Sequence, residues 1–190
     1  MRNVLSAIIV LGLFQIAIGQ GEYKLTNHWM VIKGTSNLHN WESKVNDLRC
    51  AANITTTTTL SVKSLNYLTA EIPIKSIKSD KGSIMDNKTY DALKAGSYSI
   101  ISLKLVNVNK IENKPDGVTI NTSCNLTIAG VTKKVDIIVT GKVNADGSIR
   151  FAGSKKIKMT DFNIKPPTAL LGSLTTGDEV EIAFSIVLKK

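Results

Sequence analysis

Apolar and polar residues alternate along most of this chain, and the C-terminal segment shows the pattern most clearly. Val180, Ile182 and Phe184 share one parity, which Ile186 and Leu188 continue. The positions between them are mostly charged or small. Because successive side chains of a β-strand point to opposite faces, this alternation predicts a strand with one buried face.

The same alternation occurs in earlier segments. Ile101, Leu103 and Leu105 alternate with Ser102 and Lys104. Further apolar positions of one parity follow at Val118, Ile120, Cys124, Leu126, Val135, Ile137 and Val139. Helical periodicity is almost absent, so the chain is predicted to be all-β.

Turn signals separate the predicted strands. Glycine, which readily adopts a positive φ, occurs in Pro115-Asp116-Gly117, in Ala145-Asp146-Gly147 and in Ala129-Gly130. Gly177-Asp178 predicts a turn before the last strand, and the β-branched block 55–59 predicts a further strand. Antiparallel strands joined by such turns, about eight in number, predict a closed barrel or a sandwich.

One segment departs from the alternation. Between Ser83 and Ala95, the residues Met85, Tyr90 and Leu93 have rough helical spacing, and a glycine follows where a helix would end. We therefore expect one short helix in an otherwise antiparallel β-domain.

The first nineteen residues have the pattern of a secretory signal peptide. Arg2 is basic, positions 4–18 are almost entirely apolar, and Ala17-Ile18-Gly19 offers small residues for cleavage. The apolar run is short for a bilayer span, and no basic cluster follows it, so an integral membrane anchor is not expected. Residues 1–19 are therefore predicted to be the signal peptide and residues 20–190 a single domain that is periplasmic or secreted.

The chain is basic, with a formal net charge of +9. The lysines are scattered and form no stripe interleaved with aromatic residues, so a nucleic-acid partner is not expected. Two cysteines, Cys50 and Cys124, leave open either a disulfide or two small buried thiols. A homodimer is also left open.

Catalytic and metal chemistry have little support in the sequence. The only histidines are His28 and His39, which have no acidic residues at ligand offsets, and no nucleophile elbow is present. We expect no enzyme activity, no metal and no cofactor, with His39 orienting a turn. The alternative is a pair formed by Cys50 and a histidine, or a relay between a histidine and an aspartate.

Four segments, in order along the chain, resemble the YceI-like family. "LTIAGVTKKVDIIV" at 126–139 is similar to the central hairpin of that family, and "GTSNLHNWE" at 34–42 to an early segment of one branch. "IPIKSIKSDKGSIMDNKTYDALKA" at 72–95 is similar to its strand and single helix, and "KIKMTDFNIKPP" at 156–167 to its late strand and loop. The loop "AGSYSIISL" departs from the family, because it lacks the usual proline before the next strand.

The resemblance implies a lipocalin-like, eight-stranded antiparallel barrel that carries a long isoprenoid lipid in the bacterial periplasm. The expected function is therefore that of an exported carrier, with an apolar lipid as its partner. The alternative is a packed structural or adaptor barrel that acts through its surface without bound lipid. An outer-membrane barrel fits the length but conflicts with the scarcity of aromatic residues, which make up 5% of the chain.

An eight-stranded barrel can be filled by its own side chains or can hold one small ligand. The alternating residues are mostly of medium size, which suits an elongated apolar slot as well as an ordinary core. The candidates for lining a lipid cavity are Ile101, Leu103, Leu105, Val118, Ile120, Leu126, Val135, Ile137, Val139, Val180, Ile182, Phe184 and Ile186. The candidates for contacting a lipid headgroup are Lys75, Lys78 and Lys165.

Overall fold

The structure is a computed structural model that describes residues 19–169 and 172–190. Its long strands are β1 (Gly19–Ser36), β3 (Arg49–Thr56), β4 (Val62–Pro73), β6 (Ile100–Lys114), β7 (Gly117–Ile128), β8 (Val131–Val143), β9 (Ile149–Lys158) and β11 (Leu174–Lys189). Its short elements are β2 (Trp41–Val45), η1 (Ile74–Ser76), β5 (Ile77–Ser79), α1 (Ser83–Ala92), η2 (Met159–Phe162) and β10 (Thr168–Ala169). Residues 1–18, most of the predicted signal peptide, lie outside the described residues.

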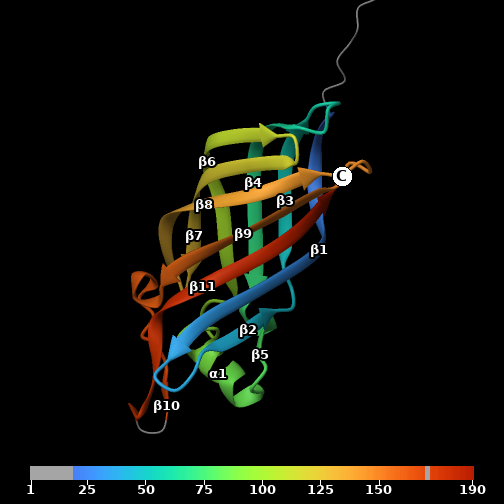
Figure 1. The fold of residues 1–190 in the computed structure, drawn as a ribbon. Coiled ribbons are helices and arrows are strands. Elements are labelled where there is room, and N and C mark those ends of the chain that lie inside the picture. The colour runs from blue at the N-terminus through green and yellow to red at the C-terminus, as the bar shows by residue number, and fades with distance from the viewer. Residues whose placement is uncertain (1–18, 170–171) are drawn as a thin grey trace, which may run out of the picture.

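The eight long strands close into one antiparallel barrel. Their order around the sheet is β1, β3, β4, β6, β7, β8, β9 and β11, and β11 pairs back onto β1. Figure 1 shows β8, β9, β11 and β1 crossing in front of β3, β4, β6 and β7. The predicted fold, an eight-stranded lipocalin-like barrel with one short α-helix, is confirmed.

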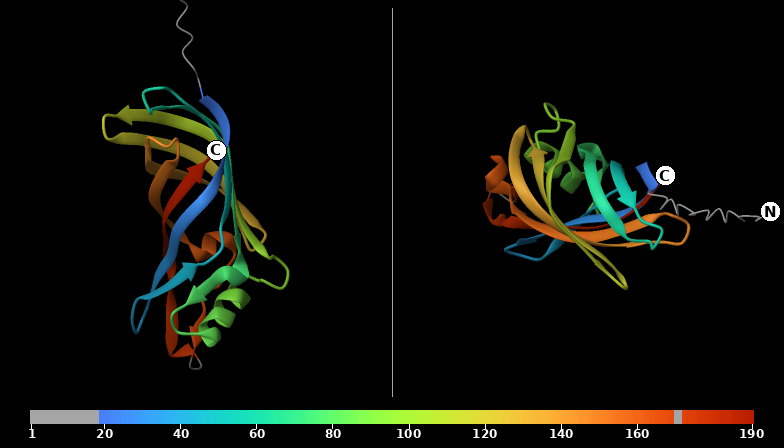
Figure 2. Two further views of the ribbon diagram at one scale, coloured as in Figure 1. Left: turned by 90° about the vertical axis from the view of Figure 1, so that its right-hand side faces the viewer. Right: turned by 90° about the horizontal axis from the view of Figure 1, so that it is seen from above.

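The short elements gather at one end of the barrel. β2 pairs with the second half of β1, and β5 pairs with β2, so a small sheet extends the barrel beside α1. Figures 1 and 2 show α1 at this end and the C-terminus at the other. The sequence pattern did not predict β2, β5 or β10, because strands of two to five residues are too short for alternation to be recognised.

Element boundaries differ from the predictions in three places. The Thr-rich block is strand only as far as Thr56, since the chain then turns, with Leu60 at a φ of 57°. Gly177-Asp178 lies inside β11, which begins at Leu174, so the expected turn before the last strand is wrong. The helix begins at Ser83 as expected but ends at Ala92 rather than at Ala95. Just beyond it, Lys94 takes a positive φ of 54°.

Two apolar clusters fill the two ends of the barrel. The cluster at the end near the C-terminus contains Tyr23, Leu48, Cys50, Ala52, Ile54, Val62, Val118, Ile120, Val143, Ile149, Phe151, Ile186 and Leu188. The cluster at the helix end contains Val45, Ile74, Ile77, Ile101, Ile128, Ala129, Phe162 and Ile164. Met30 and Ile72 pack against both clusters, so they connect the two ends along β1 and β4.

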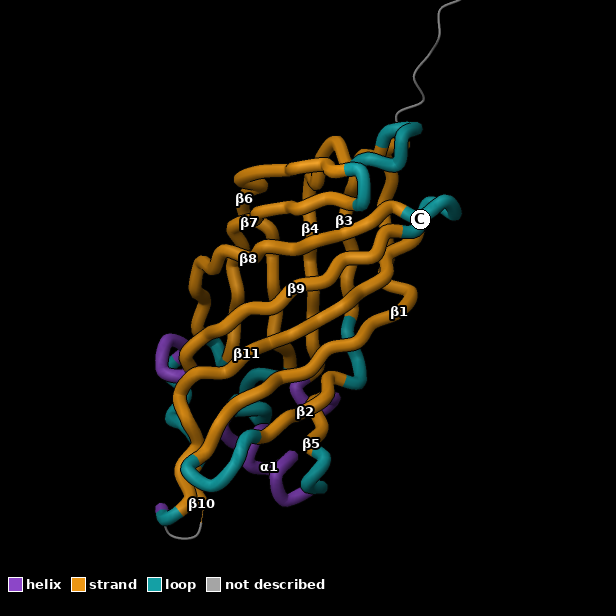
Figure 3. The backbone as a smooth tube through the Cα atoms, viewed as in Figure 1, coloured by secondary structure: helices purple, strands orange, loops and turns teal. Residues whose placement is uncertain are grey.

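The barrel wall parts at two places. β8 and β9 pair only from Val139 with Gly153 to Val143 with Ile149, and η2 lies against both strands beyond that point. β4 and β6 pair only over Thr69–Pro73, and β6 carries bulges after Leu105 and after Val108. Bulges bend a strand and increase its twist, which accounts for the outward curl of the β6–β7 hairpin in Figures 2 and 3.

Candidate functional site

The inner wall of the barrel is built from cross-strand rows of apolar side chains. Directly paired residues of neighbouring antiparallel strands place their side chains on the same face. One row runs from β6 to β1 through Ile111, Ile120, Val139, Gly153, Phe184 and Met30. A shorter row joins Leu105, Cys124 and Val135. The interior therefore presents a nearly continuous hydrocarbon surface.

All of the sequence-predicted cavity residues have the parity of this inner face. Several of them belong to the end clusters or pack against them: Ile101, Val118, Ile120, Leu126, Val139, Phe184 and Ile186. The others belong to neither cluster and do not pack against either: Leu103, Leu105, Val135, Ile137, Val180 and Ile182. The structure thus separates end-filling residues from a middle belt, and a role for any of them in holding lipid stays a prediction.

The middle belt is incompletely covered. Leu103, Leu105, Val135 and Ile182 point inward by their register yet keep part of their surface accessible. Ile137 and Val180, the other two members of the belt, are buried. A fully packed barrel of this size would bury the first four side chains as well, since protein interiors are close-packed. Their exposed area indicates free space beside β6, β8 and β11.

Two polar side chains of β7 lie on the inner wall and make local contacts. Thr122 donates a hydrogen bond from Oγ1 to the carbonyl oxygen of Ile137 at 3.0 Å. The thiol of Cys124 lies 3.6 Å from the same Oγ1. Burial raises the pKa of Cys124, so this thiol stays protonated at neutral pH. Neither group is left as a reactive centre.

The two cysteines form no disulfide. Both Cys50 and Cys124 are free and buried, which is the second of the two alternatives left open by the sequence. Burial raises the pKa of Cys50 to about 11. Since the thiolate is the nucleophilic form, a thiol with such a pKa is a poor nucleophile at physiological pH.

A lysine that is not among the predicted site residues shares the inner face. Lys155 on β9 pairs with Ile182 on β11, and Gly153 and Ile157 are its inward neighbours on the same strand. Its side chain is half-buried. The inward parity of Lys155 could be read from the alternation along this strand, but a charged residue predicts an exposed position. The residues of that parity are Ile149, Phe151, Gly153, Lys155 and Ile157.

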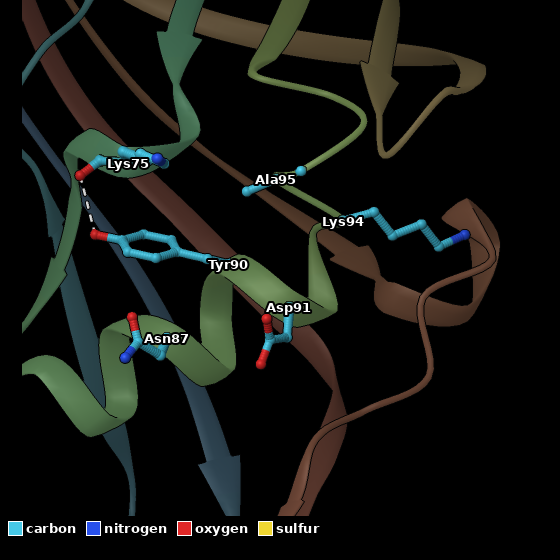
Figure 4. A pocket seen from close by; sticks show the side chains of 7 residues that line it. Lys75, Asn87, Tyr90, Asp91, Lys94 and Ala95 are labelled. Atoms are coloured by element: carbon cyan, nitrogen blue, oxygen red, sulfur yellow. Dashed lines mark hydrogen bonds between the residues drawn. The ribbon is translucent and has the colours of Figure 1, made fainter.

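A hollow on the surface lies beside α1 and includes one predicted headgroup residue. A pocket of about 560 Å³ is lined by Lys75, Asn87, Tyr90, Asp91, Lys94, Ala95 and Gly96. Figure 4 shows Lys75 and Lys94 on opposite sides of Tyr90 and Asp91. A smaller pocket of about 180 Å³ adjoins it and is lined by Pro73, Ile74, Lys75, Ala95 and Ser99. Lys75 therefore stands between a polar hollow and an apolar one.

The other two predicted headgroup residues are placed differently. Lys78 donates to the hydroxyl of Tyr90 at 2.7 Å and lies 3.2 Å from Oδ2 of Asp86. These two contacts raise the pKa of Lys78, the hydrogen bond to Tyr90 contributing most. Lys165 is exposed in the segment after η2. The structure does not bring Lys75, Lys78 and Lys165 together into one site.

The histidines take part in local contacts. Nε2 of His28 lies 3.2 Å from the carbonyl oxygen of Val45. His39 lies in the turn after β1, where its backbone N–H donates to Oγ of Ser36 at 3.1 Å. Among residues 19–169 and 172–190, no group of three His, Cys, Asp or Glu side chains is placed to hold a metal ion. In the same part of the chain, no helix has the length and apolar character needed to cross a bilayer.

Comparison with known proteins places this geometry among related barrels. A family model described as a YceI-like domain matches residues 24–188. A polyisoprenoid-binding domain from Saccharophagus degradans, implicated in plant cell wall breakdown, superposes with a TM-score of 0.66 at 14% identity, covering 90% of this chain and 99% of that one. Comparison with curated proteins finds no match.

Two further solved structures share the fold. BcnA of Burkholderia cenocepacia gives a TM-score of 0.62 at 20% identity, over 84% of this chain and 95% of that chain. The YceI protein of Campylobacter jejuni gives a TM-score of 0.59 at 23% identity, over 78% of this chain and 84% of that chain. At these low sequence identities, the similarity shows a shared barrel fold and no more.

Proposed function

Because the chain belongs to the YceI-like family, we propose that it is an exported carrier that binds a long apolar lipid of the isoprenoid type inside its barrel. The carrier is periplasmic or secreted and performs no chemical step on its cargo. Its partner is the lipid, and neither nucleic acid nor a membrane anchor has a part in the proposal.

The observation that carries the proposal is the incompletely covered belt in the middle of the barrel. Inward side chains such as Leu103, Leu105 and Ile182 keep accessible surface although strands surround them. Apolar wall that faces neither protein nor ligand is unfavourable in water, and an apolar chain placed there would remove it from water. The polyisoprenoid-binding domain of the same fold adds support for the choice of lipid.

The energies involved suit an isoprenoid chain. Each buried methylene-sized group contributes about 0.8 kcal/mol, so one five-carbon unit contributes about 4 kcal/mol before losses. Ordering the flexible chain lowers this gain. Micromolar binding needs about 8 kcal/mol, which a few buried units can supply. Apolar burial has no direction, so the length and shape of the free space would set the selectivity.

Solvent extraction of protein purified from its own host tests the proposal. We expect mass spectrometry of the extract to show one lipid species with a long apolar chain, close to one mole per mole of protein. The N-terminus of the same sample, read by intact mass, should begin after Gly19 if the chain is exported through its signal peptide. Protein that yields no lipid would favour the packed adaptor barrel instead.

A further inference from the structure

Lys155 is a half-buried charged residue on the mostly apolar inner face of the barrel. Its register partner Ile182 pairs in turn with Ile32 of β1, so its side chain belongs to a row of the inner wall. On the same strand, Lys156 and Lys158 have the opposite parity and are exposed. Lysine side chains are almost never taken into a protein interior without a partner.

In the described part of the chain, the amine of Lys155 forms no ion pair and no hydrogen bond. Six acidic residues of the paired barrel strands have outward parity: Glu22, Glu71, Glu112, Asp136, Glu179 and Glu181. Asp178 follows the inward parity of β11, but its carboxylate accepts hydrogen bonds from the backbone and side chain of Thr160. The inner wall therefore offers Lys155 no free anion.

The position of Lys155 along the barrel is also specific. The last pair between β8 and β9 is Val139 with Gly153, and Lys155 is the next inward residue of β9 beyond it. On β8 the corresponding next inward residue is Ile137, a member of the middle belt. Lys155 thus lies on the inner wall at the point where β8 and β9 part. The middle belt reaches the unpaired edge of β8 at the same point. Lys133, further along β8, has the same inward parity but is exposed.

We propose that Lys155 binds an acidic headgroup, a carboxylate or a phosphate monoester, of the lipid whose apolar chain lies along the middle belt. This inference rests on the proposed carrier function and narrows its ligand class from apolar lipids in general to anionic ones. A charge-assisted hydrogen bond in a partly desolvated site offsets the cost of holding a lysine against an apolar wall. Lys75, beside α1, is then not the residue that recognises the head.

A matched pair of ligands tests the inference: geranylgeranyl monophosphate and geranylgeraniol, which share one chain and differ in the head. Equilibrium dialysis of the purified, delipidated protein at low ionic strength gives both dissociation constants. We expect the wild type to prefer the phosphate by about tenfold or more, the fold-change that corresponds to 1.4 kcal/mol and lies at the lower end for hydrogen bonds to charged groups.

Three variants identify the residue responsible. Lys155→Met should bind the two ligands alike while keeping the affinity for the alcohol, and Lys155→Arg should keep the preference. Lys156→Met is the matched control, since it removes a lysine one position away on the outer face. Circular dichroism and a denaturation midpoint establish that each variant is folded.

The outcomes distinguish a failure of the anionic-head inference from a failure of the proposed carrier function. Wild-type protein that binds the alcohol and the phosphate equally would overturn the anionic-head inference and leave the carrier intact. Preference that survives in Lys155→Met, or that disappears in Lys75→Met instead, would also overturn it. Wild-type protein that binds neither ligand would overturn the isoprenoid carrier, and the inference with it.

Discussion

The indole ring of Trp41 lies directly over Gly34, and a Cβ at Gly34 would be only 2.2 Å from Cζ2 of the ring. The two residues are register partners on β2 and β1. The indole N–H also donates to the carbonyl oxygen of Thr35 at 3.0 Å. The segment 34–42, which carried part of the family resemblance, is thus a structural corner that fixes the small sheet to the barrel.

Replacement of Gly34 by alanine should therefore destabilise the fold. The rigid indole cannot move aside without losing its own contacts, so we expect a loss of about 1–3 kcal/mol in the free energy of unfolding. Urea denaturation measures it. Gly96→Ala is the matched control, because nothing lies within 4 Å of a Cβ at Gly96. Equal midpoints for the two variants would show that the contact between Trp41 and Gly34 is dispensable.

Ile137→Phe should reduce lipid binding without unfolding the protein. Ile137 has the inward parity of the middle belt, so the larger ring narrows the free space there. We expect at least a tenfold loss of affinity for geranylgeraniol in equilibrium dialysis. Ile138→Phe is the control, since the neighbouring isoleucine is 56% exposed on the outer face. If a folded Ile137→Phe variant binds like the wild type, Ile137 does not line the cavity.

The thiols of Cys50 and Cys124 should be unreactive in the native protein. Because burial raises the pKa of Cys50 to about 11 and also raises that of Cys124, neither thiol is deprotonated at pH 7.5. We expect almost no reaction with Ellman's reagent under native conditions and two thiols per chain in denaturant. Fast labelling of the folded protein would contradict the burial. Fewer than two thiols in denaturant would point to a disulfide or to oxidation.

Asp86 should stabilise the helix end of the barrel in a pH-dependent way. Its buried side chain accepts a hydrogen bond from the backbone N–H of Ser79 at 2.7 Å and pairs with Lys78. These contacts, led by the bond from Ser79, lower the pKa of Asp86 below its usual value of 3.8. The stabilisation is therefore fully present above about pH 4 and is lost as the pH falls through the lowered pKa.

Asp86→Asn should accordingly cost about 1.5–3 kcal/mol at pH 7, the usual range for a hydrogen bond to a charged group. The difference from the wild type should shrink below pH 4, which thermal denaturation at several pH values can follow. Asp91→Asn, on the exposed side of the same helix, should change little at any pH. A difference between Asp86→Asn and the wild type that stays constant down to pH 2 would exclude the charged pair as its source.

The inner face of the barrel could be predicted from alternation alone. The inner face contains Leu126, Ile137 and Phe184, as their parity predicts. A strand with one buried face needs apolar residues at every second position. Strand ends were harder to place. The turn at Leu60 carries no proline or glycine, and Gly177 is accommodated inside β11, where a Cβ would lie 2.4 Å from Oγ1 of Thr35.

The candidate site was predictable only in its apolar part. The charge of Lys78 and its position near a loop predict a headgroup residue. Its contacts with Asp86 and Tyr90 form only when α1 packs on the segment after β4. Alternation does not identify Lys155, because the pattern is recognised from apolar residues. A lysine at an inward position interrupts the pattern and does not reveal which face of the strand it occupies.

The parting of β8 from β9 leaves backbone groups of both strands without a ladder partner across the gap, which makes each of them a local sheet edge inside a closed barrel. Such edges can recruit a strand from another molecule and start aggregation. Lysines line both strands at this point: Lys133 and Lys134 on β8, and Lys155, Lys156 and Lys158 on β9. Their mutual repulsion would disfavour intermolecular pairing, so the basic character of the chain also protects the gap between β8 and β9.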